Sequence, residues 1–367
     1  MKKALILYAK SGALGHAVIA RNYAELLDAN GYAAIEGDCF AIDGKAVIRG
    51  GEKIYRWWLK AAPWFWQFLY KYWTYIPGAH WFKNYLHPRL YPKTQAFILA
   101  QKPDLIITTH PTATTIVNFL KNKKLCQSKF LTTFSDWHTQ AFHVYKHVDK
   151  YLVVTPEQID DLAHLNIAKE KIAVSGILLS QNYYRLPDKK EARIKLGLPP
   201  DKKIILAMGG GMSWQIEETI DALSKIAAPV KILIVANAEL KNKIDSEKIQ
   251  IVISSELSDY FAASDLLISK PGGLTTAQAF MAKLPLLATA PLPGQEDENI
   301  KYLLSKKAII LRDINTGFTE QIEQVLSSPE MLKNTAENAY RLAPKNAPKI
   351  VLEILNDALY SDTSHET

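Results

Sequence analysis

The chain has 367 residues, of which 48% are hydrophobic and 22% charged, and its formal net charge is +7. This composition is ordinary for a globular protein, and the length predicts two domains. Two cysteines exclude a disulfide framework and favour a reduced, cytoplasmic setting. The positive charge suits an anionic partner such as a membrane surface, a nucleic acid or a nucleotide. No run of about 18 apolar residues is present, so we expect no spanning helix and membrane contact from one side only.

The first strand is expected at residues 4–8, an apolar run too short for a secretory signal. A glycine-containing loop follows it and leads into the first helix at His16. Ligands of open α/β sheets bind where strands end, so His16 is a candidate base for an attacking hydroxyl. The positive end of the helix would lower the pKa of His16 and keep it neutral. A histidine that only caps or packs is the alternative.

Residues 55–91 are rich in aromatic side chains. They include Trp57, Trp58, Trp64, Trp66, Trp73 and Trp81, six of the eight tryptophans, interleaved with lysines and arginines. Tryptophan favours the membrane–water interface, and basic side chains reach anionic headgroups from there. The segment therefore predicts contact with an anionic membrane, with an aromatic-rich domain or dimer interface as the alternative. Single-stranded nucleic acid also stacks on aromatics, but these apolar runs suit lipid better, so we expect no nucleic-acid partner.

Asp136 follows an expected strand at residues 130–134 and so also lies where a strand ends. Its carboxylate can orient His16 or an acceptor hydroxyl; the alternative is a helix N-cap shared with Ser135. Three histidines follow, at positions 138, 143 and 147. Their spacing, without a nearby cysteine, does not favour a metal site, and we expect them on a partly solvated polar face.

The apolar strand-like runs fall into two series. The first comprises residues 4–8, 105–109, 130–134, 150–154 and 172–175, and the second residues 203–208, 231–236, 249–253, 266–269, 285–288 and 308–311. Such strands between helical patterns predict parallel sheets in two Rossmann-like domains. The boundary should fall near residues 176–187, before a basic helix at 188–196. A last helix at 349–360 has one apolar face, and residues 361–367 are expected to be disordered.

Two glycine turns follow strands of the second series. Gly209, Gly210 and Gly211 come after residues 203–208, where consecutive glycines permit close approach to a phosphate; an ordinary turn is the alternative. Gly272 and Gly273 come after residues 266–269 and precede a helix whose free N–H groups and dipole suit a diphosphate.

A polar loop is expected at residues 293–299. There Gln295, Glu296 and Asn299 can hydrogen-bond sugar hydroxyls. Together with the Gly272 turn, this loop indicates a nucleotide-sugar site rather than a bare phosphate site.

The chain resembles the glycosyltransferases that make monogalactosyl- or glucosyl-diacylglycerol from UDP-sugars, relatives of the murein-pathway enzyme that adds N-acetylglucosamine to a lipid-linked precursor. The likeness covers most of the chain. It is carried by Lys270-Pro271-Gly272-Gly273, Gly294-Gln295-Glu296, Asn299, Gly15-His16, Pro103-Asp104-Leu105-Ile106-Ile107, His110-Pro111, Asp136 and Val174-Ser175-Gly176-Ile177.

The resemblance implies a GT-B fold, with two Rossmann-like domains whose parallel sheets face each other across a cleft. Residues 1–178 would take the lipid acceptor and rest on the cytoplasmic face of a membrane as a peripheral protein. Residues 179–345 would take the UDP-sugar, and residues 346–367 would cross back to the first domain as a helix and tail. Catalysis would be inverting and need no metal or other cofactor, because the helix dipole and backbone amides offset the diphosphate charge.

The resemblance also implies roles for individual residues. His16 is the candidate base with Asp136 as its alternative, Gly15 and His110 lie on the acceptor side, and the tryptophans contact the membrane. The donor set is Gly209, Gly210, Gly211, Ser254, Pro271, Gly272, Gly273, Leu274, Thr275, Gln278, Gln295, Glu296 and Asn299. Within it, residues 272–275 cradle the diphosphate, Gln295 and Glu296 hold the sugar, and Ser254 lies near the uracil.

Four positions depart from the family pattern. Gln278 stands where many relatives carry a glutamate for the ribose hydroxyls, Gln140 and His143 replace a histidine and a tryptophan, and Leu178 replaces a proline. Most of these changes lie on the acceptor side. A polyprenyl-linked sugar or a sterol therefore stays open as the acceptor. The same fold would also suit a UDP-sugar epimerase or a non-catalytic nucleotide-sugar sensor.

Overall fold

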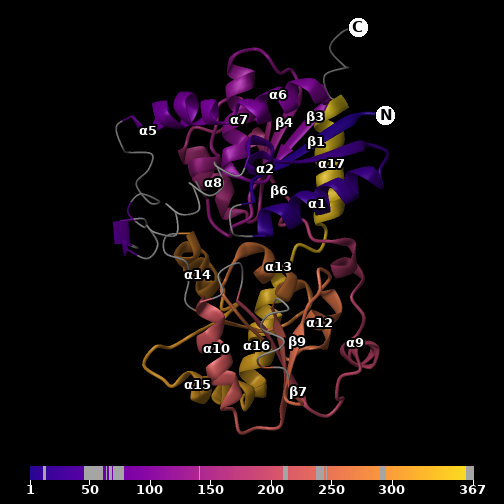
Figure 1. Ribbon diagram of the computed structural model, residues 1–367, viewed down its shortest axis with the longest axis vertical. Helices are drawn as coiled ribbons and strands as arrows, with labels where there is room; N and C mark the ends of the chain where they lie inside the picture. Colours follow the sequence, from indigo (N-terminus) through magenta and orange to yellow (C-terminus); the bar gives the residue numbers. More distant parts are fainter. Residues whose placement is uncertain are drawn as a thin grey trace. The chain divides into compact units, whose positions relative to one another are not determined.

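The computed structural model divides the chain into two compact units, Met1–Leu178 with Asn346–Thr367, and Leu179–Lys345 (Figure 1). The structure describes residues 1–10, 14–44, 61–62, 64–65, 68, 78–139, 141–209, 214–236, 244, 246–289 and 295–360, with the backbone alone at 80, 214–215, 295 and 360. Six predicted site residues lie outside these ranges: Gly210, Gly211, Trp57, Trp58, Trp66 and Trp73. The tail at 361–367 and Gln140 lie outside them as well.

The first unit is built on a parallel sheet whose strand order is β2-β1-β3-β4-β5-β6. The strands are β1 (Lys3–Tyr8), β2 (Ala33–Asp38), β3 (Leu105–Thr108), β4 (Lys129–Thr133), β5 (Lys150–Val153) and β6 (Ile172–Val174). The helices are α1 (Gly15–Asp28), α2 (Cys39–Asp43), α5 (Ala79–Trp81), α6 (Pro92–Gln101), α7 (Pro111–Asn122), α8 (Glu157–His164) and α17 (Ala347–Tyr360). A π-helical turn η2 (Phe82–Leu86) and 3₁₀ turns η3 (His87–Leu90), η4 (Ala141–His143) and η5 (Lys169–Lys171) complete the unit.

The second unit repeats this plan with the strand order β12-β11-β10-β7-β8-β9, again all parallel. Its strands are β7 (Lys203–Met208), β8 (Val230–Val235), β9 (Ile249–Val252), β10 (Leu266–Ser269), β11 (Leu286–Ala288) and β12 (Ile310–Leu311). Its helices are η6 (Gln181–Arg185), α9 (Lys189–Leu196), α10 (Trp214–Ser224), α12 (Ser258–Ala263), α13 (Gly273–Met281), α14 (Gln295–Ser305), α15 (Phe318–Leu326) and α16 (Pro329–Arg341). The prediction of two Rossmann-like units is confirmed.

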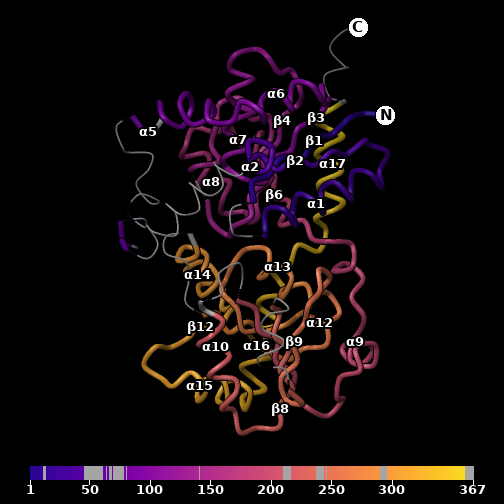
Figure 2. Tube along the Cα trace, in the orientation of Figure 1, coloured from indigo at the N-terminus to yellow at the C-terminus, as the bar shows by residue number. Residues whose placement is uncertain are grey.

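The last helix, α17, belongs to the first unit although it follows the second in sequence. It runs beside β1 and α1, as the trace in Figure 2 shows. Lys2 Nζ donates to the carbonyl oxygen of Leu359 at 3.4 Å, which links the start of the first strand to the end of this helix. The apolar face predicted for α17 is buried at Val351 and Leu355.

Every predicted strand is present, and the structure adds β2. The sequence Ala-Ala-Ile-Glu-Gly-Asp of β2 has no continuous run of large apolar residues, and most of its residues are half-buried. The basic helix predicted at 188–196 is α9. The Asp188 side chain caps this helix by accepting from the Glu191 backbone N–H at 2.9 Å. The Glu191 side chain in turn accepts from the Asp188 backbone N–H.

Both sheets reverse their strand order at one place. In the first unit the chain starts at β1 and adds β2 on one side and β3 on the other, and in the second it starts at β7 and adds β8 and β10. A crevice opens at the carboxyl ends of the strands at such a switch point, and ligands of open α/β sheets bind there. The loops after β1, β3, β7 and β10 are therefore where sites are expected.

Candidate functional site

His16 and His110 meet at the switch point of the first sheet. His16 lies in the first turn of α1, which follows β1, and His110 follows β3. Their ring centroids are 4.8 Å apart with the rings nearly perpendicular. His110 caps α7, because its Nδ1 accepts from the Thr112 backbone N–H at 3.1 Å. His16 does not cap its helix, so the alternative in which it is only a cap is excluded.

Burial keeps both imidazoles uncharged. It lowers the pKa of His16, whereas the Asp136 carboxylate acts in the opposite direction. The pKa of His16 is lowered, as predicted, but the main cause is burial and not the positive end of the helix. The pKa of His110 lies well below its ordinary value because of burial and the neighbouring His16. A neutral imidazole with a carboxylate near it can take up a proton and have the resulting cation stabilised.

Asp136 is buried on the segment that follows β4. No helix starts beside it, so the alternative of an N-cap shared with Ser135 is wrong. Its main-chain carbonyl accepts from Gln158 Nε2 at 3.4 Å, which holds the segment against α8. The Asp136 carboxylate lies near enough to His16 to raise the pKa of that imidazole against the effect of burial.

The prediction that the later histidines lie on a partly solvated polar face is wrong for His143. This residue is buried, with its ring 4.9 Å from that of Phe134. The segment folds inward because η4 packs against α7. Burial and the nearby His16 and Lys83 hold the pKa of His143 well below its ordinary value. Within the described ranges, no group of three histidine, cysteine, aspartate or glutamate side chains is placed to hold a metal ion.

The glycine turn after β10 stands at the switch point of the second sheet. Gly272 is the N-cap of α13, and no side chain caps this helix. The first α-helical hydrogen bond runs from the Thr276 N–H to the Gly272 carbonyl at 3.0 Å. The backbone of Gly273, Leu274 and Thr275 thus forms an uncapped helix start at the carboxyl end of a central strand, the geometry that receives phosphate groups.

The turn is clamped by α14. Lys270 Nζ and Glu296 Oε1 form an ion pair at 2.6 Å, with the two side chains 15% and 4% exposed. Asn299 Nδ2 donates to the Pro271 carbonyl at 3.3 Å. A charged residue that is buried and paired fixes the loop beside it, because leaving either charge unpaired is costly.

Residues 295–299 belong to α14, so the prediction of a polar loop there is wrong. Acidic residues fill the first turn of α14, which is a helix-start signal that the sequence offered. Glu296 and Asn299 are three residues apart and therefore share a helix face. Sequence reasoning gave no role to Lys270 beyond its place before Pro-Gly-Gly, and no signal in the sequence identified Glu296 as its partner.

The other predicted donor residues are spread more widely. Gly209 follows β7, and a Cβ there would lie 2.8 Å from Cβ of Ile216, so close packing on α10 alone requires glycine. Gln278 is half-buried on α13, one turn beyond Leu274 and Thr275. Ser254 is exposed after the edge strand β9, and its hydroxyl donates to the Glu256 carbonyl at 2.6 Å. Nothing in the described residues brings Ser254 to the glycine turn.

An apolar stripe covers α5, η2 and η3. It consists of Trp81, Phe82, Tyr85, Leu86 and Leu90, all exposed, with Trp81 60% and Leu90 54% accessible. Trp64, another tryptophan predicted to contact the membrane, is 70% exposed. In the view of Figure 1, α5 lies on the opposite side of the first unit from α17. No helix in the described part of the chain is long and apolar enough to cross a membrane.

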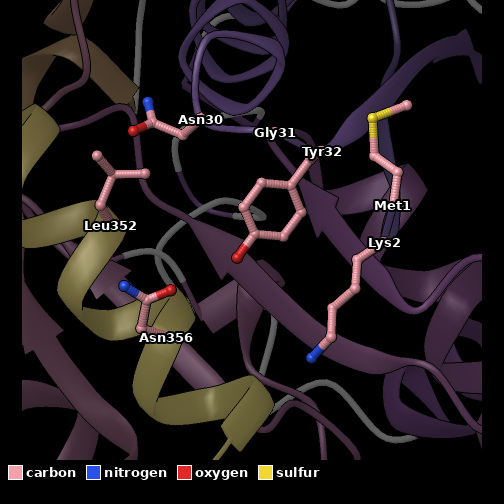
Figure 3. Close-up of a pocket in the computed structure, with 7 residues that line it drawn as sticks. All are labelled: Met1, Lys2, Asn30, Gly31, Tyr32, Leu352 and Asn356. Carbon is pink, nitrogen blue, oxygen red and sulfur yellow. The ribbon is translucent and has the colours of Figure 1, made fainter.

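A cavity of about 450 Å³ opens at the other end of the first sheet. It is lined by Lys2 before β1, by Asn30 and Tyr32 after α1, and by Leu352 and Asn356 of α17 (Figure 3). This cavity lies at the amino ends of the strands, away from the switch point. It is therefore separate from the histidine pair.

Comparisons with known proteins show what the chain is similar to. Residues 16–179 match the model of the family described as monogalactosyldiacylglycerol (MGDG) synthase. The processive diacylglycerol beta-glucosyltransferase of Staphylococcus saprophyticus is 27% identical over 285 residues, which are 74% of this chain and 72% of the relative. The protein of the same name from Bacillus licheniformis is 25% identical over 265 residues, 68% of each chain.

Solved structures show the same fold. MurG of Acinetobacter baumannii superposes with a TM-score of 0.60 at 14% identity, over 97% of this chain and 100% of MurG. The spinosyn rhamnosyltransferase SpnG does so with a TM-score of 0.61 at 12% identity, over 96% and 99%. The two parallel sheets and these likenesses show that the chain has the GT-B fold. Residues 16–179 and the relatives at 27% and 25% identity make the chain similar to the diacylglycerol glycosyltransferases, and this similarity supports a glycosyltransferase.

Proposed function

We propose that this protein is a membrane-associated, inverting glycosyltransferase that moves glucose or galactose from a UDP-sugar to diacylglycerol at the cytoplasmic face. The names of the relatives support the acceptor. One observation carries the proposal, which is that each unit has a candidate site at the switch point of its sheet. In the first unit this site is His16 with His110, and in the second it is the Gly272 turn.

In this proposal the donor diphosphate binds at the start of α13. The backbone N–H groups of residues 273–275 and the positive helix end offset its charge, so the reaction needs no metal. Glu296, held by Lys270, stays beside the turn, where it and Gln295 hold the sugar. Gln278 meets the ribose one turn further along the helix. A structure of Staphylococcus aureus MnaA with UDP, at a TM-score of 0.61 and 12% identity, supports a uridine nucleotide on this fold.

The acceptor hydroxyl is activated in the first unit. Its oxygen attacks the anomeric carbon of the donor sugar while the bond from that carbon to the UDP oxygen breaks. The proton passes to the neutral His16 imidazole, the Asp136 carboxylate stabilises the imidazolium, and UDP leaves with the bonding electron pair. Attack opposite the leaving group inverts the anomeric centre.

The apolar stripe would bring the first unit to the lipid. Aromatic side chains such as Trp81 and Tyr85 are typical of membrane interfaces, and exposed Arg89 and Lys93 beside them suit anionic headgroups. Replacing Trp81 and Phe82 by serine should weaken co-sedimentation with anionic vesicles at least fivefold. Leu125→Ser, at an exposed leucine before β4, is the matched control and should bind as the wild type does. If the variant with serine at positions 81 and 82 binds vesicles as well as the wild type does, the apolar stripe is not the membrane-binding surface.

The activity test uses radiolabelled UDP-glucose or UDP-galactose with diacylglycerol vesicles. The wild type should make labelled glycolipid, and His16→Ala should lose about a hundredfold or more in kcat with UDP binding unchanged. His164→Ala, at an exposed histidine that ends α8, is the control. No glycolipid with either donor overturns the proposal. If product forms only with a polyprenyl-linked sugar or only with a sterol, that compound is the acceptor in place of diacylglycerol. Conversion of the UDP-sugar without any acceptor identifies an epimerase.

A further inference from the structure

One lysine of the apolar stripe region turns inward. Lys83 is buried on η2, although Trp81, Phe82 and Tyr85 around it are exposed. Its Nζ donates to the carbonyl oxygens of Ala141 at 3.0 Å and Val144 at 2.9 Å. The same ammonium lies 3.9 Å from the centre of the Tyr145 ring. Lys83 thus directs its donors at one short segment of chain, 58 to 61 residues away in sequence.

This arrangement is costly for packing alone. No carboxylate pairs with Lys83 among the residues that the structure describes, and burial lowers its pKa to about 7. An apolar side chain of similar length would fill the same space without that penalty. We therefore attribute the presence of the ammonium to its hydrogen bonds, which hold η4 and the residue after it in place.

The segment that Lys83 holds is part of the catalytic region. It runs from Asp136 through η4 to Tyr145, and the buried His143 lies inside it, near enough to His16 and Lys83 for both to affect its pKa. The far end of the segment is fixed by Tyr151 on β5. The Tyr151 hydroxyl accepts from the Tyr145 backbone N–H and donates to the Tyr145 carbonyl oxygen. Lys83 thus links the exposed stripe directly to the chain that carries Asp136.

We propose that Lys83 is a positioning residue that couples the seating of the apolar stripe on a lipid surface to the placement of the segment 136–145. This inference rests on the proposed function, since it assumes that the stripe meets lipid and that Asp136 serves His16. Its consequence is specific: the ammonium sets turnover of the lipid acceptor, and neither UDP binding nor vesicle binding depends on it.

The test compares Lys83→Met, which keeps the length and removes the donors, with Lys83→Arg, which can still bridge two carbonyls. Kinetics use UDP-glucose or UDP-galactose with diacylglycerol vesicles, UDP affinity comes from calorimetry, and vesicle affinity from co-sedimentation. For Lys83→Met, kcat should fall tenfold or more, with both affinities within twofold of wild type. Lys83→Arg should recover kcat to within about threefold. Lys3→Met is the control, since Lys3 Nζ also donates to a backbone carbonyl, that of Gln101 at 2.9 Å, at the start of β1.

Unchanged kcat in Lys83→Met, or an equal loss in Lys3→Met, overturns the inference. A wild type that binds UDP and vesicles but makes no glycolipid overturns the proposed function instead, so the two failures are distinguishable. If Lys83→Met does not fold, hydrogen exchange on the wild type decides. Vesicles should then slow amide exchange in residues 141–144 as well as in the stripe, and exchange there that ignores the vesicles contradicts the coupling.

Discussion

The ion pair under the glycine turn gives the sharpest stability prediction. Glu296→Gln keeps the size of the side chain and removes its charge, which leaves the Lys270 ammonium 15% exposed and facing a neutral amide. The same helix carries a matched control. Lys301 and Glu298 pair at the same 2.6 Å, but their side chains are 66% and 40% exposed. The two substitutions differ in burial and not in chemistry or bond length.

Burial decides the expected cost. Removing one partner of a buried pair costs about 3–5 kcal/mol, whereas an exposed pair contributes about 0–1 kcal/mol. Because the glutamine oxygen still accepts a hydrogen bond from Lys270, we expect about 2–3 kcal/mol for Glu296→Gln. In a unit of about 150–250 residues each kcal/mol lowers Tm by roughly 2–4 °C, so the transition of the second unit should fall by roughly 4–12 °C. Glu298→Gln should shift it by less than about 2 °C.

Thermal unfolding followed by circular dichroism measures both shifts, and calorimetry measures UDP affinity in the same samples. The double substitution Lys270→Met with Glu296→Leu removes both charges and should restore Tm to near the wild-type value. UDP affinity should stay weakened in it, because the turn has lost its clamp. If Glu296→Gln and Glu298→Gln melt together, the buried pair does not hold the turn and the reasoning fails.

Three further predictions concern single positions. Gly272→Ala should fold normally, since its Cβ would meet no atom nearer than 3.6 Å, yet it should weaken UDP binding at least about tenfold by calorimetry. Gly209→Ala should lose about 1–3 kcal/mol in urea unfolding, because its Cβ would lie 2.8 Å from Ile216. Between pH 7 and 10 the wild type should gain about 1.4 kcal/mol per pH unit relative to Lys83→Met. The folded Lys83 loses its proton near pH 7 and the unfolded one near 10.5, while His143 stays neutral; a pH-independent difference in urea unfolding contradicts this.

The positions of most strands along the chain were predictable because each buried strand carries its own signal in the sequence. A run such as Leu-Leu-Ile-Ser at β10 is apolar and short, and a glycine turn follows it. The edge strand β2 carries no such run, and its mostly half-buried residues need not be apolar. The start of α14 was mistaken for a loop because its polar side chains were interpreted as ligands before their helix-start pattern was weighed.

Contacts between distant segments were not predictable in the same way. The sequence supplies His16, His110 and Asp136 as separate residues after separate strands, and only the strand order brings the two histidines together. The partners of Lys270 and Lys83 depend on which helix packs over which loop, and no local pattern encodes that.

The half-buried Lys270 and the buried Lys83 have different kinds of partner. Each holds a loop that follows a strand of its sheet, but Lys270 is paired with a carboxylate and Lys83 with neutral carbonyls and an aromatic ring. An ion pair keeps its geometry while both groups stay charged, whereas carbonyl oxygens do little to keep an amine protonated once it is buried. Because the buried Lys83 loses its proton near pH 7, we expect turnover of the lipid acceptor to change with pH near neutrality.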